Sequence, residues 1–256
     1  MSTRELATAT RLARAAGVVL LRHRRQGLTI RSKAGGEIVT SGDLESDRLI
    51  RDGLAEAFPE DALCTEETAD SPGRLAAKRV WIVDPLDSTS AYANGGDQFA
   101  VSVGLAVDGE PVLGVVYNPA RGELIAGGRG LGVTLNRRPV HVSTADSLAS
   151  ARLIVSPKEW RQGLDGLPAT PIASMAYKLA RVAAGLDDGV FSIKARKAWG
   201  SCAGVALVLA AGGSATQLDG SPVRFNRPLD CHARGLVAAG PRLHPALLAH
   251  LSGVPG

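Results

Sequence analysis

Two aspartates and a short run of hydroxyl side chains follow one apolar segment of the sequence. The β-branched run at residues 80–83 predicts a buried strand that ends at Asp84-Pro85, because proline lacks a backbone donor. With a proline turn between them, Asp84 and Asp87 can converge on one point in front of this strand. Convergent carboxylates repel each other, and a bound cation removes the repulsion. Oxygen ligands favour hard ions, so we expect Mg²⁺ first and Mn²⁺ or Ca²⁺ next.

The hydroxyl residues come directly after these aspartates. Ser88, Thr89 and Ser90 suit the start of a helix, where free backbone N–H groups bind phosphate. A cation site beside such a helix start indicates phosphoryl chemistry. The alternative is an ordinary boundary between a strand and a turn, in which the aspartates and serines only cap the backbone.

A third aspartate lies at the predicted start of another helix. Gly35-Gly36 predicts a turn, and residues 37–40 predict a short strand. Residues 44–58 then predict a helix with Asp43 as its N-cap. Helix capping is by itself a sufficient reason for an aspartate at this position.

A pair of glutamates follows the next short apolar segment. Residues 62–65 predict a strand that ends at Glu66 and Glu67. The pair could lie in a solvated loop. Alternatively, Glu66 could fold back beside Asp84, because only a loop of ordinary size separates the two segments.

These segments resemble one known family. Asp84-Pro-Leu-Asp87-Ser-Thr is similar to the Asp-Pro-hydrophobic-Asp-Gly-Thr signature of the inositol monophosphatase superfamily of Mg²⁺-dependent phosphatases. Lys33 with the Val-Thr-x-x-Asp43 element, and the acid pair that begins at Glu66, resemble two further segments of that family. The resemblance extends from about residue 33 to the end of the sequence.

The resemblance implies a role for each matching residue. The positions that bind the metal ions correspond here to Glu66, Asp84, the Leu86 carbonyl and Asp87. Glu66, Asp43 and Thr89 would orient and deprotonate the attacking water. In such two-metal hydrolysis one ion generates hydroxide and the other stabilises the leaving oxygen, without a covalent intermediate. Asp43 can be a cap, a support for the water, or both.

A helix in the second half offers two more candidates. Ser174 can cap it, and Lys178, one turn further, can point back toward the same ligand. The alternative is an amphipathic helix with one exposed lysine. The segment resembles the Gly-Ser-x-x-Lys stretch of the branch that cleaves 3′(2′),5′-bisphosphate nucleotides. That resemblance implies that Ser174 and Lys178, together with Ser88 and Thr89, bind phosphate and substrate.

One position departs from the family. Its second lobe carries Trp-Asp, and that Asp is a metal ligand, whereas this chain has Trp199-Gly200. Losing one carboxylate should weaken the second metal site. Cations that could partly replace the lost ion are Lys194, Arg196 and Lys197. Acids that could replace the lost ligand are Asp187, Asp188 and Asp219. Ser88 is a smaller departure, where the family has glycine.

The order of predicted elements indicates an α/β (α+β) fold. The first half is rich in hairpins, with a strong turn signal at Asp108-Gly109, and the second half alternates strands and helices. The resemblance implies a layered αβαβα sandwich of two lobes with the active site in the cleft between them. We expect residues 1–145 to form an N-terminal α+β lobe that carries the metal and phosphate motifs. Residues 146–256 would form a C-terminal α/β lobe that contributes substrate binding.

Composition limits the class of protein. The 256 residues are 45% hydrophobic, which is enough for a sizeable core, and carry a net charge of +4. Three cysteines without CxxC spacing favour a reducing cytoplasm over a disulfide framework or a zinc site. We expect no membrane span and no signal peptide. We also expect no nucleic-acid partner, because the basic residues are scattered and only 4% of residues are aromatic.

The sequence predicts a Mg²⁺-dependent phosphomonoesterase acting on a small phosphorylated metabolite, and the resemblance favours a 3′(2′),5′-bisphosphate nucleotide. An inositol or sugar monophosphate is the alternative substrate. Gly200 favours a second hypothesis, in which the chain is a catalytically weakened homologue. Such a homologue would bind a phosphorylated metabolite or act as a partner protein. The retained acids favour the enzyme, because a scaffold alone does not need acids that repel one another. A homodimer is expected because family members are often dimers.

Overall fold

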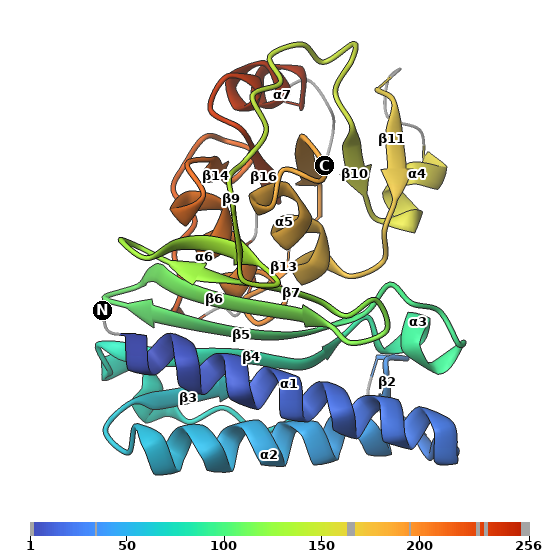
Figure 1. Cartoon of the computed structure of the whole chain (residues 1–256), viewed down its shortest axis with the longest axis vertical. Coiled ribbons are helices and arrows are strands. Elements are labelled where there is room, and N and C mark those ends of the chain that lie inside the picture. Colours follow the sequence, from blue (N-terminus) through green and yellow to red (C-terminus); the bar gives the residue numbers. More distant parts are fainter. Residues whose placement is uncertain are drawn as a thin grey trace.

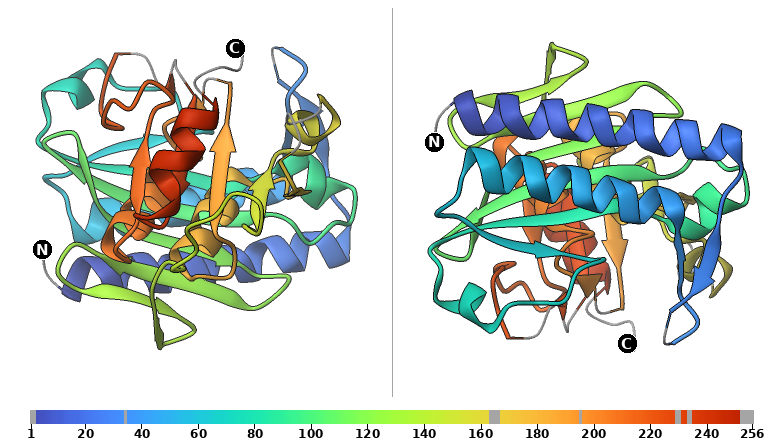
Figure 2. Two further views of the ribbon diagram at one scale, coloured as in Figure 1. Left: turned by 90° about the horizontal axis from the view of Figure 1, so that it is seen from above. Right: turned by 90° about the horizontal axis from the view of Figure 1, so that it is seen from below.

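Helices and sheets alternate in five layers (Figure 1). Helices α1 and α2 cover one face of a seven-stranded sheet, and α5 and α6 cover its other face. A five-stranded sheet lies beyond α5 and α6, and α7 packs against it from the far side. Figure 2 shows α1 and α2 side by side along the first sheet. The expected αβαβα sandwich is confirmed.

The computed structural model describes residues 3–33, 35–162, 167–194, 196–228, 231–232 and 235–251. The helices are α1 (Thr3–Gln26), α2 (Ser41–Ala57), the 3-10 helix η1 (Pro72–Ala76), α3 (Thr89–Ala93), α4 (Pro157–Gln162), α5 (Met175–Ala183), α6 (Cys202–Ala210) and α7 (Leu243–Leu251). The strands of the first half are β1 (Ile30–Ser32), β2 (Ile38–Thr40), β3 (Ala62–Thr65), β4 (Arg79–Asp87), β5 (Ala100–Val107), β6 (Glu110–Asn118), β7 (Glu123–Gly128), β8 (Gly132–Leu135) and β9 (Arg138–Val140). Those of the second half are β10 (Leu153–Val155), β11 (Ala169–Pro171), β12 (Gly189–Ser192), β13 (Arg196–Lys197), β14 (Ser214–Thr216), β15 (Cys231–His232) and β16 (Leu236–Ala239).

The seven-stranded sheet follows the order of the chain, from β3 to β9. Only β3 and β4 pair in parallel, and the other neighbours are antiparallel. The predicted turn between β5 and β6 is confirmed: Asp108 and Gly109 have φ angles of 51° and 78°, as a tight hairpin turn of the I′ type requires. In the five-stranded sheet the order is β11-β10-β12-β16-β14, with the first three strands parallel.

Helix α6 lies directly on the backbone of β5 and β6. A Cβ atom at Gly104 would come within 2.8 Å of the Ala203 nitrogen, and one at Gly114 within 2.1 Å of the Ala203 oxygen. Every residue of α6 from Cys202 to Val208 is buried, because the helix has a sheet on each side. The two glycines therefore fix the height of α6 above the first sheet.

Two predicted boundaries are wrong. Strand β4 does not end at Asp84-Pro85 but continues to Asp87, because Pro85 lies in a bulge where no ladder donor is needed. Helix α2 begins at Ser41, with Thr40 as the N-cap, so Asp43 is not the cap but the third helical residue. Among the described residues, no helix is both long and apolar enough to cross a membrane. The division into lobes at residue 145 stays a prediction.

Candidate active site

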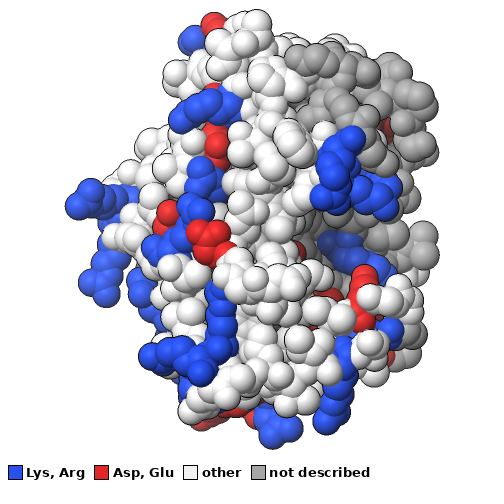
Figure 3. All heavy atoms as spheres, turned by 90° about the vertical axis from the view of Figure 1, so that its right-hand side faces the viewer, with Lys and Arg blue, Asp and Glu red and all other residues white. Residues whose placement is uncertain are grey.

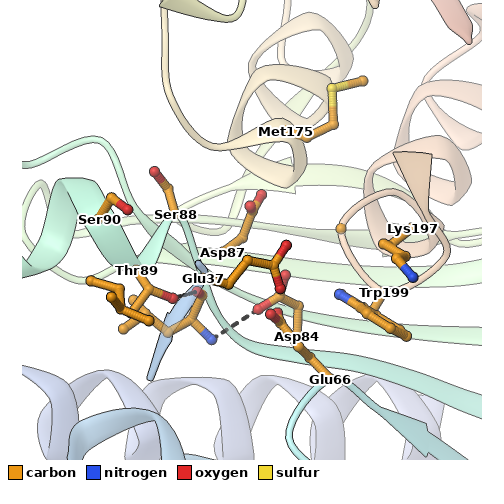
Figure 4. A pocket seen from close by; sticks show the side chains of 13 residues that line it. Glu37, Glu66, Asp84, Asp87, Ser88, Thr89, Ser90, Met175, Lys197 and Trp199 are labelled. Atoms are coloured by element: carbon orange, nitrogen blue, oxygen red, sulfur yellow. Dashed lines mark hydrogen bonds between the residues drawn. The ribbon is translucent and has the colours of Figure 1, made fainter. Parts of the chain in front are cut away.

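A cavity of about 430 Å³ opens where β4 and α3 meet the starts of α5 and α6 (Figure 4). Figure 3 looks onto the side of the molecule where α3 and β2 lie, and shows basic and acidic side chains around a hollow. The cavity is lined by Glu37, Ile38, Glu66, Asp84, Leu86, Asp87, Ser88, Thr89, Ser90, Met175, Lys197, Trp199 and Gly200. The lining therefore brings together most of the residues that the sequence singled out.

The bulge in β4 presents its acids to the cavity. Asp84 pairs with Ser102 of β5 and Asp87 pairs with Ala100, so the register shifts between the two aspartates. The Leu86 backbone N–H donates to Asp84 Oδ1 at 3.0 Å. Asp84, Leu86 and Asp87 all reach the same cavity as a result. A regular strand would turn one of the two aspartates to the opposite face of the sheet.

Glu66 lies beside these aspartates because β3 runs parallel to β4. Thr65 pairs with Val83, and the Glu66 backbone N–H donates to the Val83 carbonyl at 3.2 Å. Burial raises the pKa of Glu66 to about 7, and the charges of Glu67 and Asp87 contribute to the shift. Burial also raises the pKa of Asp84 well above its usual range, with Glu66 and Asp87 adding to it. The acids thus oppose one another's ionisation.

Lys33 partly balances this negative charge. Its Nζ lies 3.3 Å from Glu66 Oε1 and 2.5 Å from Glu67 Oε1. Burial lowers the pKa of Lys33, but the hydrogen bond to Glu67 and the charges of both glutamates outweigh it and raise the pKa. Sequence reasoning gave Lys33 no such contact, because 34 residues separate it from Glu67.

Asp43 and Thr89 form a second polar group at the edge of the cavity. Thr89 Oγ1 lies 3.2 Å from both Asp43 Oδ1 and the Leu86 carbonyl, and can donate to either. Asp43 Oδ2 accepts from the Thr40 backbone N–H at 2.8 Å and from Thr40 Oγ1 at 2.5 Å. Burial raises the pKa of Asp43, against the lowering effect of these hydrogen bonds. A Thr89 hydroxyl that donates to Asp43 leaves its oxygen free to accept a proton.

Ser88 has an unusual backbone conformation at the start of α3. Its φ angle is 79°, in the left-handed region that favours glycine. Ser88 occupies the N-cap position but its side chain makes no capping hydrogen bond. This backbone conformation explains the glycine in the Asp-Pro-hydrophobic-Asp-Gly-Thr signature. Ser88, which replaces that glycine here, adopts the same conformation at an energetic cost.

Ser174 contacts an acid of the cavity. Its Oγ donates to Asp87 Oδ2 at 2.7 Å, and the Ala176 N–H donates to the same oxygen at 2.6 Å. Ser174 is also the N-cap of α5, as predicted, because its Oγ accepts from the Tyr177 N–H at 3.0 Å. Lys178 is fully buried and is not among the residues that line the cavity, so its role in substrate binding stays a prediction.

Gly200 leaves space in the cavity wall. A Cβ atom built there would lie 3.9 Å from Asp84 Oδ2, with no other atom within 4 Å. Neither packing nor a positive φ angle requires glycine at this position.

The acids proposed as replacement ligands lie away from the cavity. Asp187 pairs with Arg181 at 2.6 Å, Asp188 pairs with Arg152 at 2.8 Å, and Asp219 bonds Ser221. Among the proposed cations, Lys197 lines the cavity and Lys194 does not, while the side chain of Arg196 lies outside the described residues.

The acids Glu66, Asp84 and Asp87 carry a surplus of negative charge that suits a cation. Within the described ranges, no group of three or more acidic, histidine or cysteine side chains is arranged to hold a metal ion. Glu66 instead contacts Lys33, and Asp87 accepts a hydrogen bond from the Ala176 N–H at the start of α5. Their ligand atoms are all oxygen, which is the donor type that Mg²⁺ prefers. The donor set therefore fits a hard divalent cation.

A layered α/β sandwich with a cluster of oxygen-donor acids is compatible with a metal-dependent hydrolase, and the comparisons with known proteins identify the family. The family model described as "Inositol monophosphatase family" matches residues 2–255. The inositol-1-monophosphatase of Synechocystis sp. is 31% identical, over 98% of this chain and 89% of the relative. The histidinol-phosphatase of Chlorobaculum parvum is 33% identical, over 90% and 81%. The protein of Pasteurella multocida named Nus factor SuhB is 31% identical, over 94% and 92%.

A solved structure agrees with this placement. The inositol monophosphatase from Anabaena (Nostoc) sp. PCC 7120 superposes with a TM-score of 0.82 at 30% identity, and the match covers 98% of this chain and 96% of the other. The chain belongs to the inositol monophosphatase family. It is a metal-dependent phosphatase.

Proposed function

We propose that the chain is a Mg²⁺-dependent phosphomonoesterase that hydrolyses a small phosphorylated metabolite with an activated water. The observation that carries the proposal is the convergence of Glu66, Asp84 and Asp87 on one cavity, where burial and mutual repulsion raise the pKa values of Glu66 and Asp84. Buried like charges lower the stability of the folded chain. A bound divalent cation would remove this repulsion, which gives the three acids a common role.

The carboxylates of Glu66, Asp84 and Asp87 and the Leu86 carbonyl would hold the metal. A bound metal would lower the pKa of a coordinated water and place positive charge beside the phosphate oxygens. Lys33 contacts Glu66 through Oε1 alone, at 3.3 Å, and has Glu67 as a closer partner at 2.5 Å. Glu67 would therefore keep the lysine neutralised if the Glu66 carboxylate turned to a cation.

Two side chains are placed to receive a proton from the attacking water, and a third, Asp43, accepts the hydrogen of Thr89. Glu66, ionised beside the cation, would accept this proton as a general base. Thr89 donates its own hydrogen toward Asp43, 3.2 Å away, and can accept one from water. The residues Ser88 and Thr89 at the start of α3 would meet the phosphate with backbone N–H groups.

We rank inositol 1-phosphate and histidinol phosphate ahead of the bisphosphate nucleotide as substrates. Two of the relatives named above are an inositol-1-monophosphatase and a histidinol-phosphatase. The nucleotide prediction depended on Ser174 and Lys178. Ser174 is turned toward Asp87, and Lys178 is buried outside the cavity lining, so their positions give the nucleotide less support.

Gly200 supports a second candidate, a homologue that binds a phosphorylated metabolite but turns it over slowly. The space beside Asp84 would accept a carboxylate that the chain does not have. This candidate differs from the first in rate and not in ligand class. It would bind the same phosphate esters with little or no release of phosphate.

The deciding experiment measures phosphate release from inositol 1-phosphate, histidinol phosphate and adenosine 3′,5′-bisphosphate during a Mg²⁺ titration. We expect turnover of at least one substrate that depends on Mg²⁺ and is lost in Asp84→Asn. Asp187→Asn is a matched control, because Asp187 pairs with Arg181 outside the cavity. A chain that binds these esters but releases no phosphate would contradict the enzyme and support the second candidate.

The expectations of a cytoplasmic location, a homodimer and no nucleic-acid partner stay proposals. The reducing compartment is proposed because the chain has three cysteines without CxxC spacing, of which Cys64 and Cys202 are buried. Light scattering of the purified protein would measure the number of chains in the particle. A binding titration with single-stranded RNA would test the third expectation, which the Nus factor name of one relative makes worth testing.

A further inference from the structure

Lys197 lies on the cavity wall formed by the segment before α6. Its side chain is exposed and belongs to the cavity lining together with Trp199 and Gly200. Its Nζ lies 5.4 Å from the centroid of the Trp199 ring, within the range of a cation–π contact. Figure 4 shows Lys197 and Trp199 on the side of the cavity opposite Ser88 and Thr89, with the acids between them.

The segment that carries Lys197 is fixed on two neighbouring elements. The Trp199 carbonyl accepts from Ser102 Oγ of β5 at 3.3 Å, and the Lys197 carbonyl accepts from Ser201 Oγ at 3.2 Å. Ser102 and Ser201 are both fully buried. The lysine therefore extends from an anchored backbone, and its ammonium group lies against the Trp199 ring.

Lys197 provides the positive charge of the cavity itself. Among the thirteen described residues of the lining, it is the one lysine or arginine, and four others are acids: Glu37, Glu66, Asp84 and Asp87. Lys33 neutralises glutamates but is not part of the lining. A phosphate ester is itself an anion, so the one described cation of the lining attracts it, whereas the four acids repel it.

The missing side chain at Gly200 leaves the cavity wall next to Asp84 open. Apart from its chain neighbours, a Cβ atom built at position 200 would have only Asp84 Oδ2 within 4 Å. An acid at position 200 would compete for the ammonium group. In this chain that group is available to the ligand.

We propose that Lys197 is a substrate-binding residue whose ammonium group contacts the phosphate oxygens of the ester from the α6 side. The assignment rests on the proposed phosphatase function for the identity of the ligand. Lys197 would form an ion pair with the phosphate in addition to any contact that a bound metal makes. The contact acts on binding, so it affects KM and the affinity for inorganic phosphate more than kcat.

The test compares Lys197→Met and Lys197→Arg with wild type at saturating Mg²⁺. Loss of a charge-assisted hydrogen bond predicts a rise in KM on the order of tenfold to a hundredfold for Lys197→Met, with a small change in kcat. Calorimetric titration with inorganic phosphate should show the same loss of affinity without any turnover. Lys197→Arg should keep most of the affinity. Lys158→Met, at an exposed lysine on α4 outside the cavity, is the matched control.

Two results would overturn the assignment. One is an active wild type whose KM and phosphate affinity do not change in Lys197→Met. The other is an equal loss in Lys197→Met and Lys197→Arg, which would indicate that Lys197 only supports Trp199. If wild type hydrolyses none of the esters, the proposed function fails, but the phosphate titration still decides whether Lys197 binds the anion. Lys197→Gln serves as a second neutral variant if Lys197→Met melts at a lower temperature.

Discussion

Two walls of the cavity are built in different ways. The acid wall, which consists of Glu66, Asp84, Asp87 and Thr89, is held by strand pairing, by the bulge in β4 and by hydrogen bonds to its carboxylates. The α6 wall, which consists of Lys197, Trp199 and Gly200, is anchored through its backbone carbonyls and through Trp199, which packs against the core, whereas Gly200 leaves open space. The comparison teaches that the fold dictates the acid wall, whereas position 200 of the α6 wall can gain a side chain without repacking.

Asp87→Ala should have the largest effect, because it removes an acid and also the acceptor for Ser174 and Ala176. We expect a fall in kcat on the order of a thousandfold, from several kcal/mol of lost metal-dependent stabilisation of the transition state. Steady-state assays at saturating Mg²⁺ would measure it. Ser174→Ala separates the two roles, and an equal loss in both variants would mean that Asp87 acts mainly by positioning α5.

Glu66→Gln tests the repulsion within the acid wall through its dependence on pH. The pKa of Glu66 rises to about 7 in the folded chain, so the folded state keeps a proton that the unfolded state loses between about pH 4.5 and 7. Stability must therefore fall as pH rises through that window. In EDTA at pH 8 we expect Glu66→Gln to be more stable than wild type by about 2 kcal/mol.

Urea unfolding at pH 5, 6 and 8 would measure this difference, which should nearly vanish at pH 5. Saturating Mg²⁺ should reverse the order at pH 8, because a cation favours the ionised glutamate. Parallel pH profiles for the two proteins would contradict the assignment of repulsion to Glu66.

Gly200→Asp tests the openness of the α6 wall. The Cβ atom of the new side chain would lie 3.9 Å from Asp84 Oδ2 with no clash, so we expect its carboxylate to join the metal ligands. We expect Mg²⁺ to bind about tenfold more tightly, as an additional carboxylate predicts. Calorimetric titration would measure the affinity, with Gly200→Ala as the control that adds a Cβ without charge. Unchanged affinity in Gly200→Asp would show that this wall does not reach the metal.

Ser88→Gly should have the smallest effect and should be stabilising. Ser88 holds a φ angle of 79°, and glycine removes the cost of that conformation, so we expect a gain of about 1 kcal/mol in the free energy of unfolding. Ser90→Gly, within the regular part of α3, should instead be destabilising. Denaturant titrations of both variants would test the contrast, and destabilisation by both would contradict the strain assigned to Ser88.

Local sequence patterns predicted those parts of the fold that depend on nearby residues. The turn at Asp108-Gly109, the strand before Glu66 and the capping of α5 by Ser174 follow from residue types a few positions apart. Asp43 was misplaced because an aspartate suits both the N-cap and the third helical position, and only the Thr40 contacts decide between them. The bulge at Pro85 was misjudged for a similar reason, because proline can end a strand or occupy a bulge within it.

Contacts between distant segments could not be predicted in this way. The hydrogen bond from Ser174 to Asp87 joins residues 87 positions apart, and the ion pair of Lys33 with Glu67 joins residues 34 positions apart. Short strands such as β11 and β14 likewise form at the two edges of the five-stranded sheet through pairing with their neighbours. The direction in which Lys178 is buried depends on the packing of α5 between two sheets.

Helix α6 rests on β5 and β6 at Gly104 and Gly114, where a Cβ atom would collide with the backbone of Ala203. A helix seated in this way cannot sink or rise when the residue before it changes size. Over evolutionary time, position 200 can therefore gain or lose a carboxylate in one substitution while the interior is inherited unchanged. Divergence among relatives at this position would record a change of ligand preference, separate from the slow drift of the core.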